Sequence, residues 1–271
     1  MLDYLEAHVT DHCNYKCQGC GHFSTLASKK NVDVSIFERD IKRMSELIPQ
    51  IHHVRLMGGE PLLHPKVVDF LYVTRKYYPK SRISLVSNGL LIKKMKSNFW
   101  TSITDNNIQF ELTVYPYEHS TEGKYTVIDQ GVDLDYYRKK YGVDIKVQKT
   151  AAFFSLINLR GDSNPKKAMG ACRTIFNCPN LYEGKVFICP MTANINYFND
   201  KFKTSIPGYP ISKTGWIDIH EEGITAEKLL KHIDTSCSTC KFCTENPTYY
   251  KWKLNKKPEI SDWISPDGWL E

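Results

Sequence analysis

Cys13-Asn14-Tyr15-Lys16-Cys17-Gln18-Gly19-Cys20 sets three cysteines at the spacing C-x3-C-x2-C. Three thiolates this close together can ligate three irons of a cubane cluster and leave the fourth iron open to a small chelating molecule. Structural zinc and iron–sulfur sites usually have four protein ligands, so the missing fourth cysteine points to a working cluster. On these cysteines alone, a zinc knuckle or three unrelated buried thiols are the alternatives.

A second motif, Gly58-Gly59-Glu60-Pro61, follows the apolar segment 53–57, which we predict to be a strand. A glycine pair alone would indicate only a turn. The helix expected from Pro65 onward makes the motif a loop between a strand and a helix. Together, the three cysteines and this motif resemble the cluster loop and the methionine-binding motif of the radical S-adenosylmethionine (radical SAM) enzymes.

The resemblance implies cofactors and roles for particular residues. The three cysteines would hold a [4Fe–4S] cluster whose open iron binds S-adenosylmethionine, and reductive cleavage would give a 5′-deoxyadenosyl radical that abstracts hydrogen. The backbone at the two glycines would approach the amino group of this cofactor, and the Glu60 carboxylate would contact that ammonium. The further cofactor-binding candidates are Pro61, Phe23 beside the adenine, Asn88 at a strand end and Thr113 near the ribose. Core packing is the alternative for Phe23, and a plain turn is the alternative for Asn88.

Strand-like and helix-like segments alternate over the first part of the chain. We expect strands at 5–9, 53–57, 82–86, 108–114, 144–147 and 153–159, with helices between them, one of them at 125–141. A capping box at Ser35 and Glu38 is expected to begin the first helix. This alternation predicts right-handed βαβ units and a parallel sheet. The resemblance implies that the six strands form a partial (β/α)6 TIM-like barrel over residues 1–162.

Six further cysteines follow a linker at 163–167: Cys172, Cys178, Cys189, Cys237, Cys240 and Cys243. We expect a hairpin that turns at Glu183-Gly184, shortly before the third of them. Residues 163–271 resemble the small cysteine-rich auxiliary-cluster modules (SPASM and the shorter twitch) of some radical SAM enzymes, which implies one auxiliary [4Fe–4S] cluster with four ligands. Cys172, Cys189, Cys240 and Cys243 are the leading set, and Cys178 and Cys237 are the substitutes. A zinc ribbon, or two clusters of which one has an open iron, are the alternatives.

The composition is that of a globular enzyme, with 271 residues, 41% hydrophobic and 24% charged. No run of about 18 apolar residues occurs, and Met1 to Glu6 has no signal-peptide features. We therefore expect a cytoplasmic protein whose clustered cysteines bind metal. The net charge of +6 is scattered in lysine pairs, which gives no support to nucleic-acid binding. It suits an acidic flavodoxin- or ferredoxin-type electron donor.

These features predict a radical SAM oxidoreductase with a small substrate. A fully ligated auxiliary cluster can accept the electron that a substrate radical must lose, and the layout resembles the aminocyclitol dehydrogenases, which convert a secondary alcohol to a ketone. A sugar or cyclitol is therefore the expected substrate. Epimerisation is a near variant that needs a hydrogen donor such as Cys178 or Cys237.

Two alternative functions belong to other classes. The main one is a maturase that modifies a ribosomally made peptide. Outside catalysis, an iron–sulfur electron carrier or a zinc-binding interaction module would explain the cysteines but not the glycine motif. The aromatic tail from Asn246 to Glu271 is expected to cover the barrel or to line the substrate opening.

Overall fold

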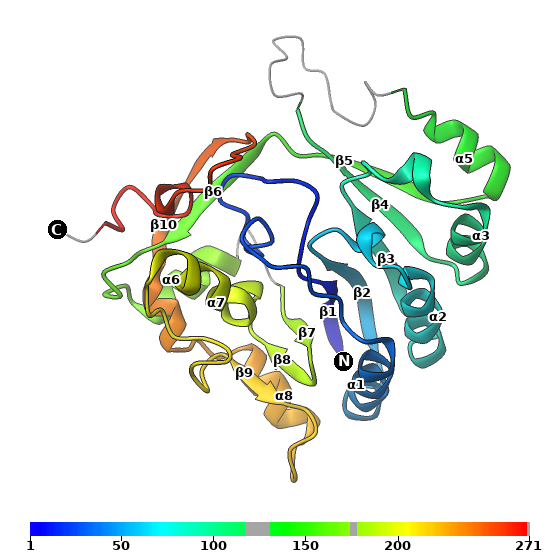
Figure 1. Ribbon diagram of the computed structural model, residues 1–271. Coiled ribbons are helices and arrows are strands. Elements are labelled where there is room, and N and C mark those ends of the chain that lie inside the picture. The colour runs from blue at the N-terminus through cyan, green and yellow to red at the C-terminus, as the bar shows by residue number, and fades with distance from the viewer. Residues whose placement is uncertain (117–130, 174–177, 270–271) are drawn as a thin grey trace. The chain divides into compact units, whose positions relative to one another are not determined.

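The computed structural model describes residues 1–116, 131–173 and 178–269, and the chain forms two compact units (Figure 1). The first unit comprises Met1–Asn14 and Lys29–Ala151, and the second comprises Tyr15–Ser28 and Ala152–Glu271. The main break therefore falls at 151, before the expected boundary at 162. In addition, the segment carrying Cys17 and Cys20 is grouped with the C-terminal part. None of the described helices is long and apolar enough to cross a membrane.

The first unit is built on five parallel strands in the order β5-β4-β3-β2-β1. The strands are β1 (Leu2–Thr10), β2 (Ile51–Gly58), β3 (Arg82–Ser87), β4 (Gln109–Val114) and β5 (Ile145–Lys149). One face of this sheet is covered by the helices α1 (Val34–Leu47), α2 (Val67–Tyr77), α3 (Ser97–Asp105) and α5 (Leu134–Tyr141) (Figure 1). The predicted alternation of strands and helices is confirmed.

The two faces of this sheet differ in chemistry because successive strand residues point to opposite sides. Leu5, Leu56, Leu85 and Leu112, one from each of four strands, are fully buried. The alternate positions carry charged groups, of which Glu111 of β4 accepts from Arg55 of β2 at 2.8 Å. One face of the sheet is thus apolar, and the other carries a largely buried ion pair.

Two helix starts differ from the expectation. Asp33, not Ser35, caps α1, because its carboxylate accepts from the backbone amides of Ser35 and Ile36. Glu38 instead pairs with Lys76 of α2 at 2.7 Å. The helix expected at 125–141 begins at Leu134 within the described residues, and its positions 125–130 lie outside them.

The sixth expected strand is not part of the parallel sheet. β6 (Ala152–Ile157) pairs antiparallel with β10 (Cys243–Lys251) in the second unit. The described parallel sheet therefore has five strands rather than six. A short apolar run is compatible with a parallel sheet or an antiparallel sheet, and its periodicity does not identify the partner strand.

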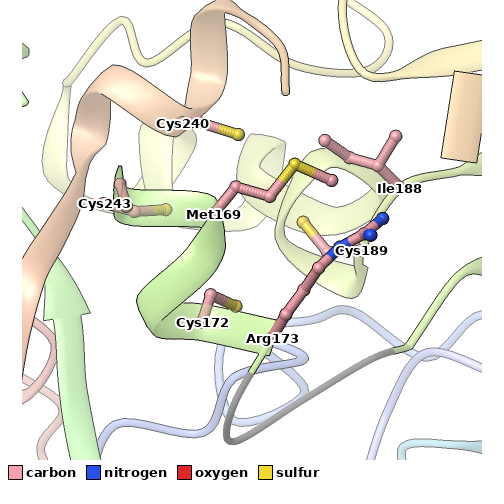
Figure 2. Close-up of a pocket in the computed structure, with 8 residues that line it drawn as sticks. Met169, Cys172, Arg173, Ile188, Cys189, Cys240 and Cys243 are labelled. Atoms are coloured by element: carbon pink, nitrogen blue, oxygen red, sulfur yellow. The ribbon is translucent and has the colours of Figure 1, made fainter. Parts of the chain in front are cut away.

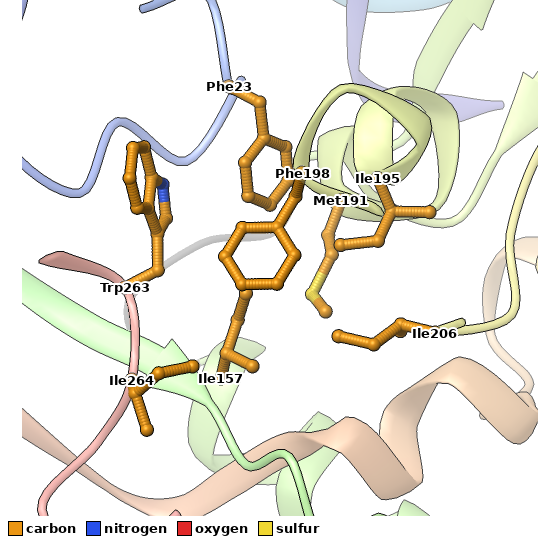
Figure 3. Close-up of a cluster of buried hydrophobic side chains, with 8 residues drawn as sticks. All are labelled: Phe23, Ile157, Met191, Ile195, Phe198, Ile206, Trp263 and Ile264. Atoms are coloured by element: carbon orange, nitrogen blue, oxygen red, sulfur yellow. The ribbon is translucent and has the colours of Figure 1, made fainter. Parts of the chain in front are cut away.

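The second unit contains α6 (Pro165–Arg173), β7 (Asn180–Tyr182), β8 (Lys185–Phe187), α7 (Pro190–Phe202), β9 (Trp216–Asp218) and α8 (Ala226–Ile233). The predicted hairpin is confirmed: β7 and β8 pair antiparallel, and Glu183 and Gly184 both have positive φ, as a tight two-residue turn requires. Figure 3 shows the core of this unit, which consists of Phe23, Ile157, Met191, Ile195, Phe198, Ile206, Trp263 and Ile264.

Candidate metal centres

The glycine motif holds the start of the cysteine loop against the end of β2. The Gly59 amide donates to the Thr10 carbonyl at 2.7 Å, and the Glu60 amide donates to the His12 carbonyl at 3.0 Å. A Cβ added at Gly58 would lie 2.1 Å from the Thr10 oxygen, and one at Gly59 would lie 2.0 Å from the His12 oxygen. The two glycines are therefore required for the close approach of two backbone segments, before any ligand is considered.

The Glu60 side chain is buried and joins two strand ends. Its oxygens accept from the Leu62 amide at 3.0 Å, the Ser87 hydroxyl at 2.7 Å and the Asn88 amide at 2.8 Å. Burial raises the pKa of Glu60 to about 7, although these three donors favour the ionised form. The Glu60 carboxylate is thus hydrogen-bonded to residues of the first unit. Its contact with the ammonium group of a ligand stays a prediction. Pro61 begins the short helix Pro61–Leu63 that follows.

Asn88 contacts the first cysteine. Its side-chain amide donates to the Cys13 Sγ at 3.5 Å and to the Asn14 Oδ1 at 2.7 Å. A hydrogen bond of this kind stabilises a thiolate and orients it for a metal. Thr113 lies near the carboxyl end of β4, which is the same edge of the parallel sheet as the glycine motif and Asn88.

Cys17, Cys20 and Phe23 belong to the second unit. Burial raises the pKa of the Cys17 thiol to about 12 and also raises that of Cys20. The Phe23 ring is 2% exposed and lies 6.1 Å from the Trp263 ring and 5.8 Å from the Phe198 ring, measured between centroids. The structure therefore favours the core-packing alternative for Phe23 over a place beside an adenine.

The four leading cysteines of the second site line one cavity. Figure 2 shows Cys172 of α6, Cys189 before α7, and Cys240 and Cys243 around the start of β10, together with Met169, Arg173 and Ile188. These residues come from three segments that are distant in the sequence. The structure brings together the set that the sequence analysis ranked first.

The two substitute cysteines lie differently. The Cys237 Sγ is 4.0 Å from the Cys240 Sγ, so Cys237 adjoins the cavity without lining it. Cys178 is buried just before β7 and is also outside the cavity lining.

The donor chemistry of both sites fits iron–sulfur clusters. Burial raises the pKa of Cys189 to about 12 and also raises the pKa of Cys243, and neighbouring thiols add to both shifts. Several buried thiols in one cavity are costly to ionise, unless a cation supplies the compensating charge. Four thiols provide a closed ligand shell, whereas the N-terminal loop provides three.

The aromatic tail contributes contacts that the sequence analysis did not foresee. Tyr250, Trp252 and Trp263 lie against the loop that carries Cys17 and Cys20. The only sequence signal was the density of aromatic residues after Asn246, which indicates burial but names no partner.

Comparison with known proteins shows which family the N-terminal part of the chain is similar to. Residues 8–104 match the model of the Radical SAM superfamily. The GTP 3′,8-cyclase of Trichodesmium erythraeum is 29% identical over 108 residues, which are 36% of this chain and 31% of that protein. The GTP 3′,8-cyclase of Petrotoga mobilis is 33% identical over 96 residues, which are 34% of this chain and 29% of that protein. The chain thus spans about 30% of the length of these two curated relatives.

A solved structure matches over a longer range. The crystal structure of BtrN in complex with AdoMet and 2-DOIA has a TM-score of 0.51 and 17% sequence identity, and the match covers 93% of this chain and 98% of that one. At this identity the likeness shows the fold, and it extends beyond the region of the family match. The family match spans both the cysteine loop and the glycine motif, so residues 8–104 are similar to the Radical SAM superfamily in the region that carries these two motifs.

Proposed function

We propose that this protein is a radical SAM oxidoreductase that oxidises a secondary alcohol of a small substrate, a sugar or cyclitol, to a ketone. Cys13, Cys17 and Cys20 would hold the [4Fe–4S] cluster with the open iron, and the four cavity cysteines would hold one auxiliary [4Fe–4S] cluster. When bound, the first cluster with S-adenosylmethionine supplies hydrogen-abstracting chemistry, and the second supplies an electron acceptor.

The observation that carries this proposal is the cavity lined by Cys172, Cys189, Cys240 and Cys243. A centre with four protein thiolates has no position left for a substrate, so electron transfer is the role it suits. Oxidation of an alcohol to a ketone removes two hydrogens and two electrons. Abstraction of a hydrogen atom removes one hydrogen together with one electron. The second hydrogen then leaves as a proton to solvent or a base, and the second electron needs an acceptor.

The chain's own residues have supporting roles. The Asn88 amide would donate to the Cys13 thiolate, as it does to the thiol here. The backbone around Gly58 and Gly59 would present polar groups to the amino end of S-adenosylmethionine. Glu60 and Pro61 would hold that loop, and Thr113 would face the ribose. The net charge of +6 suits an acidic flavodoxin- or ferredoxin-type electron donor.

Other reactions have less support. Epimerisation needs a free hydrogen-donating thiol, whereas Cys237 adjoins Cys240 and Cys178 is buried. The similarity to GTP 3′,8-cyclases covers about a third of this chain, so it does not carry their substrate over. The fold shared with BtrN, an aminocyclitol dehydrogenase, favours a small substrate over a peptide.

The test begins with iron and acid-labile sulfide per chain after anaerobic reconstitution. We expect about eight irons in the wild type and about four in a Cys13/Cys17/Cys20→Ala triple variant, as two cubanes require. The reduced wild type should then form 5′-deoxyadenosine, with one ketone formed per S-adenosylmethionine cleaved when the right cyclitol is present. About four irons in the wild type and none in the variant would remove the electron acceptor and with it the proposed oxidation.

A further inference from the structure

The C-terminal residues 250–255 run along the cysteine loop within the second unit. The Gln18 amide donates to the Lys253 carbonyl at 3.0 Å, and the Asn255 amide donates to the Lys16 carbonyl at 2.8 Å. Between these two bonds, Cys17 and Leu254 form an antiparallel bridge. We call residues 250–255 together with Trp263 the C-terminal strap. Its backbone thus pairs with the loop on both sides of Cys17.

Side chains of the strap reinforce this pairing. The Tyr250 hydroxyl donates to the Gln18 carbonyl at 3.1 Å, and the Trp263 indole N–H donates to the Cys20 carbonyl at 2.9 Å. The contact is so close that Gly19 has no room for a side chain. A Cβ there would lie 1.9 Å from the Tyr250 oxygen, and Gly19 has a φ of +60°, which favours glycine.

Trp252 packs against the loop just before Cys17. Its ring is 3% exposed and contacts Tyr15, with the ring centroids 6.0 Å apart. Tyr15 is itself buried and lies two residues before Cys17, so this contact fixes the loop on the N-terminal side of that cysteine.

We propose that the C-terminal strap is part of the first cluster site, because it holds the Cys17–Cys20 half of the loop in place for the metal. This inference rests on the proposed function, because it assumes a cluster on Cys13, Cys17 and Cys20. A tail that only covered the core would need neither backbone pairing with the loop nor a glycine at position 19. The strap would therefore slow the loss of iron from that cluster.

The first test is Tyr250→Phe, which keeps the ring and removes the hydroxyl that donates to the Gln18 carbonyl. The first cluster is identified as the EPR signal that changes when S-adenosylmethionine is added. We expect a chelator to abolish this signal about fivefold faster than in the wild type, because one hydrogen bond is lost. Tyr249→Phe is the matched control, because Tyr249 belongs to the same strand and is 63% exposed.

The second test addresses the indole of Trp263. Trp263→Phe keeps the ring that stacks on Phe23 and removes the donor to the Cys20 carbonyl. Loss of one hydrogen bond predicts iron release to a chelator about fivefold faster than in the wild type. Wild-type release rates in both Tyr250→Phe and Trp263→Phe would overturn this inference alone. A wild-type protein with no signal that responds to S-adenosylmethionine would overturn the proposed function as well.

Discussion

The side-chain amide of Asn88 donates a hydrogen bond to the Sγ of Cys13 across 3.5 Å, which joins the loop after β3 to the first cysteine of the chain. The backbone amide of Asn88 also donates a hydrogen bond to the Glu60 carboxylate at 2.8 Å. Asn88 is therefore held in place by the carboxylate of the glycine motif. A residue so fixed would be a positioning residue for the proposed first cluster.

Replacing Asn88 by alanine removes this donor and leaves its backbone bond to Glu60. We expect Asn88→Ala to release iron from the first site about fivefold faster, the equivalent of about 1 kcal/mol for one hydrogen bond. Iron transfer to a chelator, followed by absorbance under anaerobic conditions, measures the rate. Asn98→Ala, at an exposed position of α3, is the control. Equal rates in the two variants would show that the Cys13 contact has no stabilising role.

Glu60 makes stability depend on pH. Its pKa is raised from 4.5 to about 7 by burial, so its stabilising contribution is complete below the unfolded pKa and is lost as the pH rises through about 7. Between about pH 5 and pH 8, the wild type should lose on the order of 2–3 kcal/mol relative to Glu60→Gln, which cannot titrate. Chemical denaturation of both proteins across this range measures the difference. A constant difference between them would contradict the shifted pKa.

Gly59→Ala tests the close approach of the two loops. The new methyl group would lie 2.0 Å from the His12 carbonyl oxygen, so the cysteine loop must move away from β2. We expect S-adenosylmethionine binding to weaken more than about tenfold, which corresponds to about 1.4 kcal/mol. Gly21→Ala is a matched control in the same loop, because a Cβ there has no neighbour within 4 Å. Equilibrium dialysis compares the two, and similar affinities would refute the steric argument.

Cys189 and Cys178 provide a matched pair for the second site. Both are shielded in the second unit, but only Cys189 lines the cavity with three other thiols. We expect Cys189→Ser to contain about four irons per chain and Cys178→Ser to contain about eight, since one cubane holds four. Iron analysis after reconstitution decides the point. Loss of four irons in Cys178→Ser would show that Cys178 is a ligand in place of Cys189 or another of the lining cysteines.

Glu111 anchors the charged face of the parallel sheet. Its carboxylate accepts from Arg55 at 2.8 Å, Arg82 at 3.1 Å and Ser84 at 2.8 Å, and the side chain is 9% exposed. Glu111→Gln leaves two guanidinium groups without their counter-charge, which should cost on the order of 3 kcal/mol of unfolding free energy. Glu46→Gln breaks a surface pair with Arg43 and should cost less than about 1 kcal/mol. Denaturant unfolding that ranks the two variants equally would contradict a buried network.

Several features followed from local sequence because they depend on neighbours along the chain. The spacing of Cys13, Cys17 and Cys20 places three thiols in one short loop whatever the rest of the fold does. The strand before Gly58 follows from its run of apolar residues, and the turn at Glu183-Gly184 follows from the positive φ that glycine allows. Parallel pairing of five strands followed from the alternation of strands with helices.

Other features depend on which distant segments pack together, and local patterns carry no information about that. The pairing of β6 with β10, the burial of Phe23 beside Trp263 and the use of both Glu60 oxygens inside the fold are long-range contacts. Four of the six C-terminal cysteines line one cavity because α6, the end of the β7–β8 hairpin and the start of β10 come together around it. Short-range chemistry thus indicated the family resemblance and the first candidate metal site, whereas tertiary packing decided which residues contact each other, because burial and hydrogen bonding are set by residues that the chain brings together only when it folds.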